Sequence, residues 1–219
     1  MDEGASAVND FAALRGMLKQ RKVVPGEVCD LCATPVGATH SHVIELNARR
    51  ILCSCRPCYL LFTHEGAAQG RYKAIPSRFL RIADFAVDEA AWDELQIPIG
   101  LAFFFVNSLE NKMLAFYPGP AGATESQLPL ETWQSIAAGY PQLATLAPDV
   151  EAILIHRPKA GGQQWCCIVP IDAAYELVGI IRTTWRGFDG GEVAWRRIDA
   201  FFNDVAAKSE GWTTAPITS

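Results

Sequence analysis

The chain carries Cys29-Asp30-Leu31-Cys32 and, further along, Cys53-Ser54-Cys55-Arg56-Pro57-Cys58, with His40-Ser41-His42 between the two. A Cys-x2-Cys pair on a tight turn places two sulfur atoms at neighbouring corners of a tetrahedron. Two such pairs can therefore enclose one metal ion. The spacing predicts a metal site with four thiolate ligands, namely Cys29, Cys32, Cys55 and Cys58.

Three nearby residues are alternative ligands for the same ion. Cys53 lies two residues before Cys55 on one predicted strand, so both side chains can point to the same side and compete. His40 or His42 can replace one sulfur, which gives three sulfurs and one nitrogen. Zinc suits four thiolates, and the alternative is a single iron or an iron–sulfur cluster on the same cysteines.

The predicted ion has a structural role. A catalytic zinc keeps one position open for water, whereas four thiolates occupy every position. The sequence contains no His-Glu-x-x-His signature. A pairing of Cys166 with His156 would lack a third group to orient the base. These features favour a protein that is not an enzyme.

The order of elements around the cysteines is a knuckle, a hairpin and a helix. Two strand-like runs, 42–46 and 50–54, flank a turn at 47–49. Pro57 suits the first turn of the helix that follows. The partial positive charge at the start of that helix favours the thiolate form of Cys58. This order is typical of a treble-clef or zinc-ribbon-like module, in which the ion replaces a large hydrophobic core.

The rest of the chain predicts a mixed α+β domain with a mainly antiparallel sheet. The continuous apolar run 99–106 suits a strand that is covered on both faces. Neighbouring Cys166 and Cys167 should point to opposite faces of a strand, so they are expected to pack as small side chains. The polar segment 122–126 is interpreted as a connector. Further strands are predicted at 112–117, 150–156 and 165–171, and helices at 130–140, at 173–181 and around 198–205.

The chain is therefore divided into three parts. Residues 1–24 form an N-terminal helical segment, with an amphipathic helix at 8–20. Residues 25–75 form the cysteine-rich metal-binding module. Residues 76–219 form the α+β domain.

Composition argues against several classes of function. Half of the 219 residues are hydrophobic and a fifth are charged, as in a globular protein with a core. The formal net charge of -5 argues against nucleic-acid binding, which needs a basic surface. Residues 1–14 lack a signal-peptide pattern, and no apolar run is long enough to span a membrane. We expect a cytoplasmic protein, in which clustered cysteines bind metal rather than form disulfides.

Beyond the cysteine motif, five further runs carry a resemblance across nearly the whole chain. They are Leu101-Ala102-Phe103-Phe104-Phe105, Ala115-Phe116-Tyr117-Pro118, Gly122-Ala123-Thr124-Glu125-Ser126, Pro170-Ile171-Asp172 and Trp185-Arg186-Gly187. With these runs, the chain resembles an uncharacterised bacterial family often encoded beside nickel–iron hydrogenase genes. The resemblance implies a cytoplasmic accessory protein whose partner is a hydrogenase subunit or maturation factor. The alternative function is electron transfer by iron held on the same cysteines.

Overall fold

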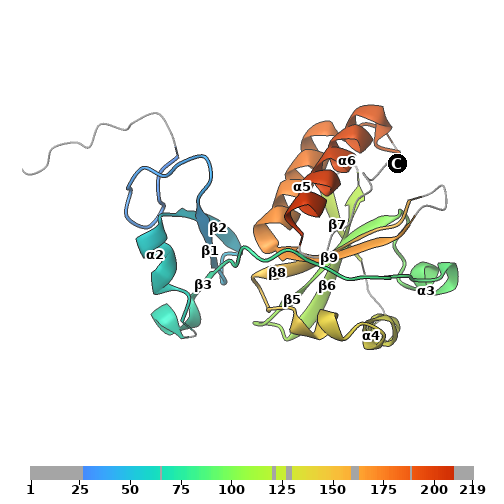
Figure 1. Ribbon diagram of the computed structural model, residues 1–219, viewed down its shortest axis with the longest axis horizontal. Helices are drawn as coiled ribbons and strands as arrows, with labels where there is room; N and C mark the ends of the chain where they lie inside the picture. Colours follow the sequence, from blue (N-terminus) through green and yellow to red (C-terminus); the bar gives the residue numbers. More distant parts are fainter. Residues whose placement is uncertain are drawn as a thin grey trace, which may run out of the picture.

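Two β-sheets lie side by side along the long axis of the molecule (Figure 1). The predicted helix at 8–20 lies outside the residues that are described. Every pairing between the described strands is antiparallel, which confirms the predicted α+β class. The computed structural model describes residues 27–64, 66–119, 122–126, 130–158, 163–187 and 189–209.

The smaller sheet belongs to the cysteine-rich part of the chain, and its strand order is β2-β1-β3. The predicted hairpin is present as β1 and β2. A third strand, β3, which the sequence did not predict, pairs with the other side of β1. The helix α2 begins directly after β2, with Pro57 in its first turn. The arrangement is compatible with a zinc-ribbon-like module. The bounds are β1 (Ser41–Glu45), β2 (Arg50–Ser54), α2 (Arg56–Leu61), the 3-10 helix η1 (Ala67–Gly70) and β3 (Tyr72–Ala74).

The larger sheet has the strand order β4-β9-β8-β5-β6-β7 and is covered by helices on both faces (Figure 1). Its strands are β4 (Leu80–Arg81), β5 (Leu101–Asn107), β6 (Lys112–Gly119), β7 (Gly122–Ser126), β8 (Glu151–His156) and β9 (Trp165–Pro170). One face packs against α5 (Ile171–Thr184) and α6 (Gly191–Lys208), and the other faces α3 (Glu89–Glu94), α4 (Leu130–Ala138) and the 3-10 helix η2 (Pro141–Thr145).

Alternate residues of each central strand enter two separate hydrophobic cores. In β5, Leu101 and Phe103 join the core under α5 and α6, whereas Ala102 and Phe104 join the core on the side of α3 and α4. Side chains alternate between the faces of a strand, so a strand covered on both sides must be apolar at every position. This confirms the interpretation of the run 99–106.

The two adjacent cysteines of β9 follow the same rule. Cys166 packs in the core beside α3 and α4, and Cys167 packs in the core beneath α6. Both are fully buried, as expected for small packed side chains. Cys166 pairs across the sheet with Ile155, whereas His156 pairs with Trp165. The strand register therefore does not place His156 opposite Cys166.

The interpretation of residues 122–126 as a connector is wrong. They form β7, which pairs with β6 at the edge of the larger sheet. An edge strand has one side without a neighbouring strand, so polar residues are tolerated there. The buried hydroxyl of Ser126 donates a hydrogen bond to the carbonyl oxygen of Leu95 at 3.1 Å, which fixes the end of the strand.

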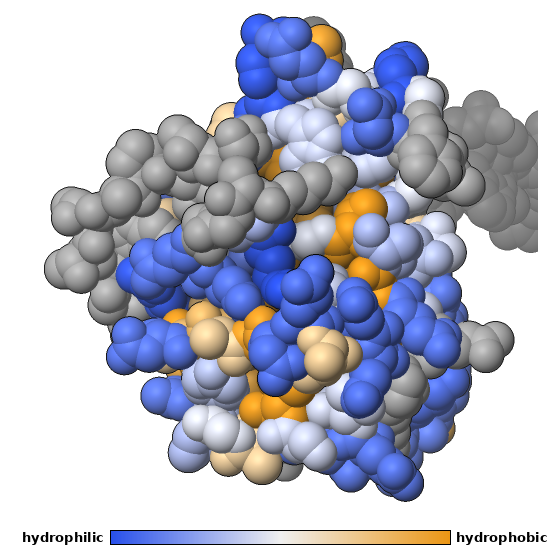
Figure 2. Space-filling model, turned by 90° about the vertical axis from the view of Figure 1, so that its right-hand side faces the viewer, coloured by the Kyte–Doolittle hydropathy of each residue, from blue (hydrophilic) through white to orange (hydrophobic). Residues whose placement is uncertain are grey.

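The end of the molecule away from the smaller sheet has a polar surface. Figure 2 views this end, where hydrophilic residues dominate the described surface and hydrophobic ones form small separate groups. Within the described residues, no helix combines the length and apolar character needed to cross a bilayer. At the opposite end of the larger sheet, a cavity of about 590 Å³ lies between the smaller sheet and the helices α5 and α6.

An ion pair with a buried carboxylate anchors the segment that connects the two sheets. Glu151 in β8 is 1 % exposed, and its two carboxylate oxygens accept hydrogen bonds from Arg78 at 2.8 and 2.6 Å. The backbone N–H of Ala147 donates to the same carboxylate at 2.8 Å. Arg78 lies between β3 and β4, so this contact fixes the path along which the chain enters the larger sheet.

Replacing Arg78 with alanine is expected to lower the free energy of unfolding by about 3 kcal/mol, because a buried carboxylate would lose its cation. The matched control is Arg196→Ala, whose partner Glu192 is 3.8 Å away and, like Arg196, well exposed. That change should cost less than about 0.5 kcal/mol. Urea unfolding followed by tryptophan fluorescence compares the two variants. Equal effects would contradict the anchoring role of Arg78.

Candidate metal centre

A tight turn carries the first pair of cysteines. An isolated bridge between Val28 and Pro35 closes it, and the N–H of Cys29 donates to the carbonyl oxygen of Thr34 at 2.8 Å. Ala33 adopts a left-handed conformation with φ of 59° and donates its N–H to the carbonyl oxygen of Cys29. The turn therefore folds back on itself and brings Cys29 and Cys32 to one side.

Two hydrogen bonds attach this turn to the end of β2. The N–H of Asp30 donates to the carbonyl oxygen of Cys53, and the N–H of Cys53 donates to a carboxylate oxygen of Asp30, at 2.8 and 2.7 Å. Cys55 follows two residues later as the N-cap of α2, and Cys58 lies in the first turn of that helix. The attachment at Cys53 thus holds the two cysteine pairs against each other.

The structure brings the four predicted thiols together. Their sulfur atoms all lie within 4.8 Å of one another, and Cys32 Sγ is 3.6 Å from Cys55 Sγ. A tetrahedral zinc site with Zn–S bonds of about 2.3 Å has sulfur–sulfur edges of about 3.8 Å. None of the seven cysteines, all of which are described, forms a disulfide. The four-thiolate site, made of Cys29, Cys32, Cys55 and Cys58, can therefore hold a metal ion.

The protein environment shifts the pKa values of two of these thiols in opposite directions. Hydrogen bonds from the hydroxyl and backbone of Thr34 lower the pKa of Cys32 to about 6. Burial and the neighbouring thiols raise the pKa of Cys58 to about 12. The expected stabilisation of the Cys58 thiolate by the start of α2 is therefore outweighed. A cation between the sulfurs would supply the compensating charge, because a coordinating thiol is deprotonated by the ion itself.

The alternative ligands form a group of their own. His40, His42 and Cys53 each offer one ligand atom, and these atoms lie within 4.8 Å of one another. His42 pairs directly with Cys53 across the hairpin, and His40 lies two residues before His42, so all three occupy one face. The expectation that they compete for the four-thiolate site is therefore replaced by a second cluster, which the sequence alone did not reveal.

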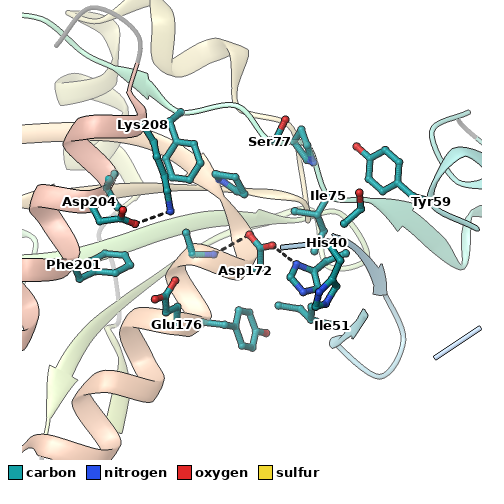
Figure 3. Close-up of a pocket in the computed structure, with 18 of the residues that line it drawn as sticks. His40, Ile51, Tyr59, Ile75, Ser77, Asp172, Glu176, Phe201, Asp204 and Lys208 are labelled. Carbon is teal, nitrogen blue, oxygen red and sulfur yellow. Dashed lines mark hydrogen bonds and ion pairs between the residues drawn. The ribbon is translucent and has the colours of Figure 1, made fainter. Parts of the chain in front are cut away.

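Two of the three residues of the second cluster line the cavity between the smaller sheet and the helices α5 and α6, here called the junction cavity. His40 and His42 line it from the module, and Asp172 and Lys208 line it from α5 and α6. Figure 3 shows Asp172 pointing toward the side of the cavity where His40 lies. His42 Nδ1 is 2.6 Å from Asp172 Oδ2, and this hydrogen bond raises the pKa of His42. The contact crosses from the smaller sheet to α5.

Alkylation should separate the cysteines by exposure and pKa. When metal is removed by a chelator at pH 7, iodoacetamide should modify Cys32 first, because this thiol is exposed and its pKa is about 6. Cys58 should react more slowly, since its pKa is about 12. Buried Cys166 and Cys167 are the internal controls and should react only after unfolding. Peptide mass spectrometry measures the order, and modification of Cys58 before Cys32 would contradict it.

Comparison with known proteins identifies a family but no function. No curated protein and no solved structure matches the chain. The model of one family, described as a family of unknown function (DUF5947), matches residues 28–209. The match includes the four-thiolate site, the second cluster and both sheets. It confirms the resemblance to an uncharacterised family, while the hydrogenase gene context stays a prediction. The chain belongs to the DUF5947 family of proteins of unknown function.

Proposed function

We propose that this chain is a zinc-binding accessory protein, and that the zinc in its four-thiolate site is structural. The observation that carries the proposal is the convergence of four sulfur atoms within 4.8 Å from the two ends of one hairpin. Structural zinc sites are closed by four protein ligands, and thiolates are the usual ones. A site filled in this way has no position for a substrate.

The packing around the site supports a structural role. The helix α2 has only six residues, and none of them is buried. A helix this short is not stable by itself in water. An ion that joins the sulfurs attaches the helix to the knuckle through Cys55 at its N-cap and Cys58 in its first turn. Zinc binding therefore supplies the free energy that α2 does not gain from hydrophobic burial.

The accessory role is the finer part of the proposal. It is supported by the resemblance to proteins that are encoded beside nickel–iron hydrogenase genes. Its partner is then a hydrogenase subunit or a maturation factor, and its compartment is the cytoplasm. The cysteines without disulfides support this compartment, because thiols stay reduced there.

Metal analysis tests the zinc assignment. The purified chain should be colourless and contain zinc, and the double variant Cys55→Ser/Cys58→Ser should lose one equivalent of zinc per chain. Amides of residues 41–61 should lose protection from hydrogen exchange in that variant, while β5, β8 and β9 keep theirs. Cys166→Ala is the control and should keep its zinc. Bound iron with visible absorption would overturn the zinc assignment and favour electron transfer.

Complex formation tests the accessory role. The zinc-loaded chain is expected to form a stable complex with a purified hydrogenase subunit or maturation factor in analytical size-exclusion chromatography. A chain stripped of zinc by a chelator should bind more weakly, because the module would no longer be folded. If none of these proteins forms a complex with the zinc-loaded chain, the accessory role is refuted while the zinc assignment stands.

A further inference from the structure

The second cluster has the geometry of a metal site in its own right. Two imidazoles and one thiol converge within 4.8 Å on one face of the β1–β2 hairpin. The rings of His40 and His42 make an edge-to-face contact, with centroids 4.7 Å apart and planes at 67°. His42 and Cys53 are paired on adjacent strands, and His40 directly precedes β1, so the sheet register positions two of the three side chains.

Both imidazoles form hydrogen bonds through Nδ1, which leaves Nε2 of each ring available to bind a metal. His40 Nδ1 is 2.8 Å from the carbonyl oxygen of Gly37, and His42 Nδ1 is 2.6 Å from Asp172 Oδ2. A histidine that binds a metal through Nε2 almost always donates its Nδ1–H to a backbone carbonyl or a carboxylate. Both acceptors of that kind are present here, one for each ring. The remaining ligand atom of each histidine is therefore Nε2.

For one of these two nitrogens, the structure offers no hydrogen-bond partner. His40 Nε2 is buried and has no hydrogen-bond partner. A buried polar atom without a partner costs about 1 to 3 kcal/mol, and such atoms are uncommon in folded proteins. A metal ion between His40, His42 and Cys53 would give this nitrogen a partner and would use the thiol beside it.

We propose that His40, His42 and Cys53 form a second metal site, separate from the four-thiolate site, that binds zinc(II) through two imidazole nitrogens and one thiolate. The proposal goes beyond the structural zinc, because three protein ligands leave a fourth coordination position. Sites with three protein ligands keep that position for water or for an exchangeable ligand. The second site is therefore an open site, and the four-thiolate site is a closed one.

The fourth position would open toward the junction cavity. His40 and His42 both line this cavity, whose volume of about 590 Å³ lies within the range of small-molecule sites. Its walls also carry Arg56 and Lys208, which are cationic, beside Glu176, which is anionic. An exchangeable ligand at the ion would thus lie among charged groups of both signs. Water or a small anion fits this position.

Asp172 is the positioning residue of the site. Its Oδ2 accepts from His42, while the backbone N–H of Ala173 donates to Oδ1 at 2.9 Å at the start of α5. The carboxylate is therefore held by the helix and in turn fixes the ring of His42. Because Asp172 belongs to α5 and His42 to β1, the larger domain contributes to a site whose ligands all come from the module.

Metal stoichiometry of the untagged full chain tests the site. The wild-type chain, loaded with zinc or cobalt(II) and freed of excess metal, should hold two equivalents. His42→Gln and Cys53→Ser should each hold one, and the cobalt–thiolate absorption of the four-thiolate site should persist as evidence that the module is folded. The matched control is His64→Gln, which changes an exposed histidine outside the cluster and should keep two equivalents.

Zinc affinity tests the positioning role of Asp172, and ligand exchange tests the open coordination position. Asp172→Asn should weaken zinc binding at the second site by about 10- to 100-fold in competition with a chelator, since the carboxylate orients His42. Asp204→Asn, at the far side of the same cavity and bonded to Lys208, should leave the affinity unchanged. Azide should shift the visible bands of cobalt in the wild-type chain and leave those of His42→Gln unchanged.

The outcomes separate this site from the structural zinc. One equivalent in the wild-type chain, with the same value in His42→Gln, would overturn the second site and leave the proposed function standing. One equivalent that is lost in His42→Gln but kept in Cys55→Ser/Cys58→Ser would refute the structural zinc and support the second site. Two equivalents in His42→Gln would show that the histidines form only a packing contact and an ion pair.

Discussion

Both metal-ligating clusters depend on the register of the β1–β2 hairpin. Glu45 pairs with Arg50 at the turn, which sets His42 opposite Cys53 at the open end. At that end, Asp30 exchanges two hydrogen bonds with Cys53, which attaches the knuckle and its thiols. One residue of β2 therefore offers its backbone to the four-thiolate site and its side chain to the second cluster. A slip of one residue would send its side chain to the opposite face and separate the histidines from the thiol.

The length of the hairpin turn explains why the sequence revealed one cluster and concealed the other. The spacing of the two Cys-x2-Cys pairs is local information, and it predicted which four thiols lie together. The predicted turn, 47–49, would have paired Leu46 with Arg50. The observed turn begins at Leu46, whose carbonyl oxygen accepts from the N–H of Arg49, and Arg49 takes a left-handed conformation with φ of 49°. Asp172 is 130 residues from His42 in the chain, so no local sequence pattern could predict their contact.

The larger domain shows a similar division between what patterns predict and what only the fold decides. Continuous apolar runs predicted strands that are covered on both faces, because burial on two sides removes the need for polar positions. Edge strands carry no such signal. The strand β7 is polar and β4 is two residues long, and both owe their conformation to a neighbouring strand rather than to their own sequence. Tertiary pairing therefore supplied what local propensity did not.

The junction between module and domain gives the two clusters different physical roles. Ion pairs cross it at Lys73–Asp149, 2.7 Å long with a buried carboxylate, at the exposed Arg49–Glu110 contact and at His42–Asp172. An exposed pair such as Arg49–Glu110 contributes less than about 1 kcal/mol, whereas the buried carboxylate of Asp149 depends on its cation, as Glu151 does. An ion on His40, His42 and Cys53 would make the Asp172 contact part of a coordination site, and the ring of His42 would be oriented by α5 only while the module stays docked. The closed site would then stabilise the module itself, while the affinity of the open site would depend on how the module sits against α5.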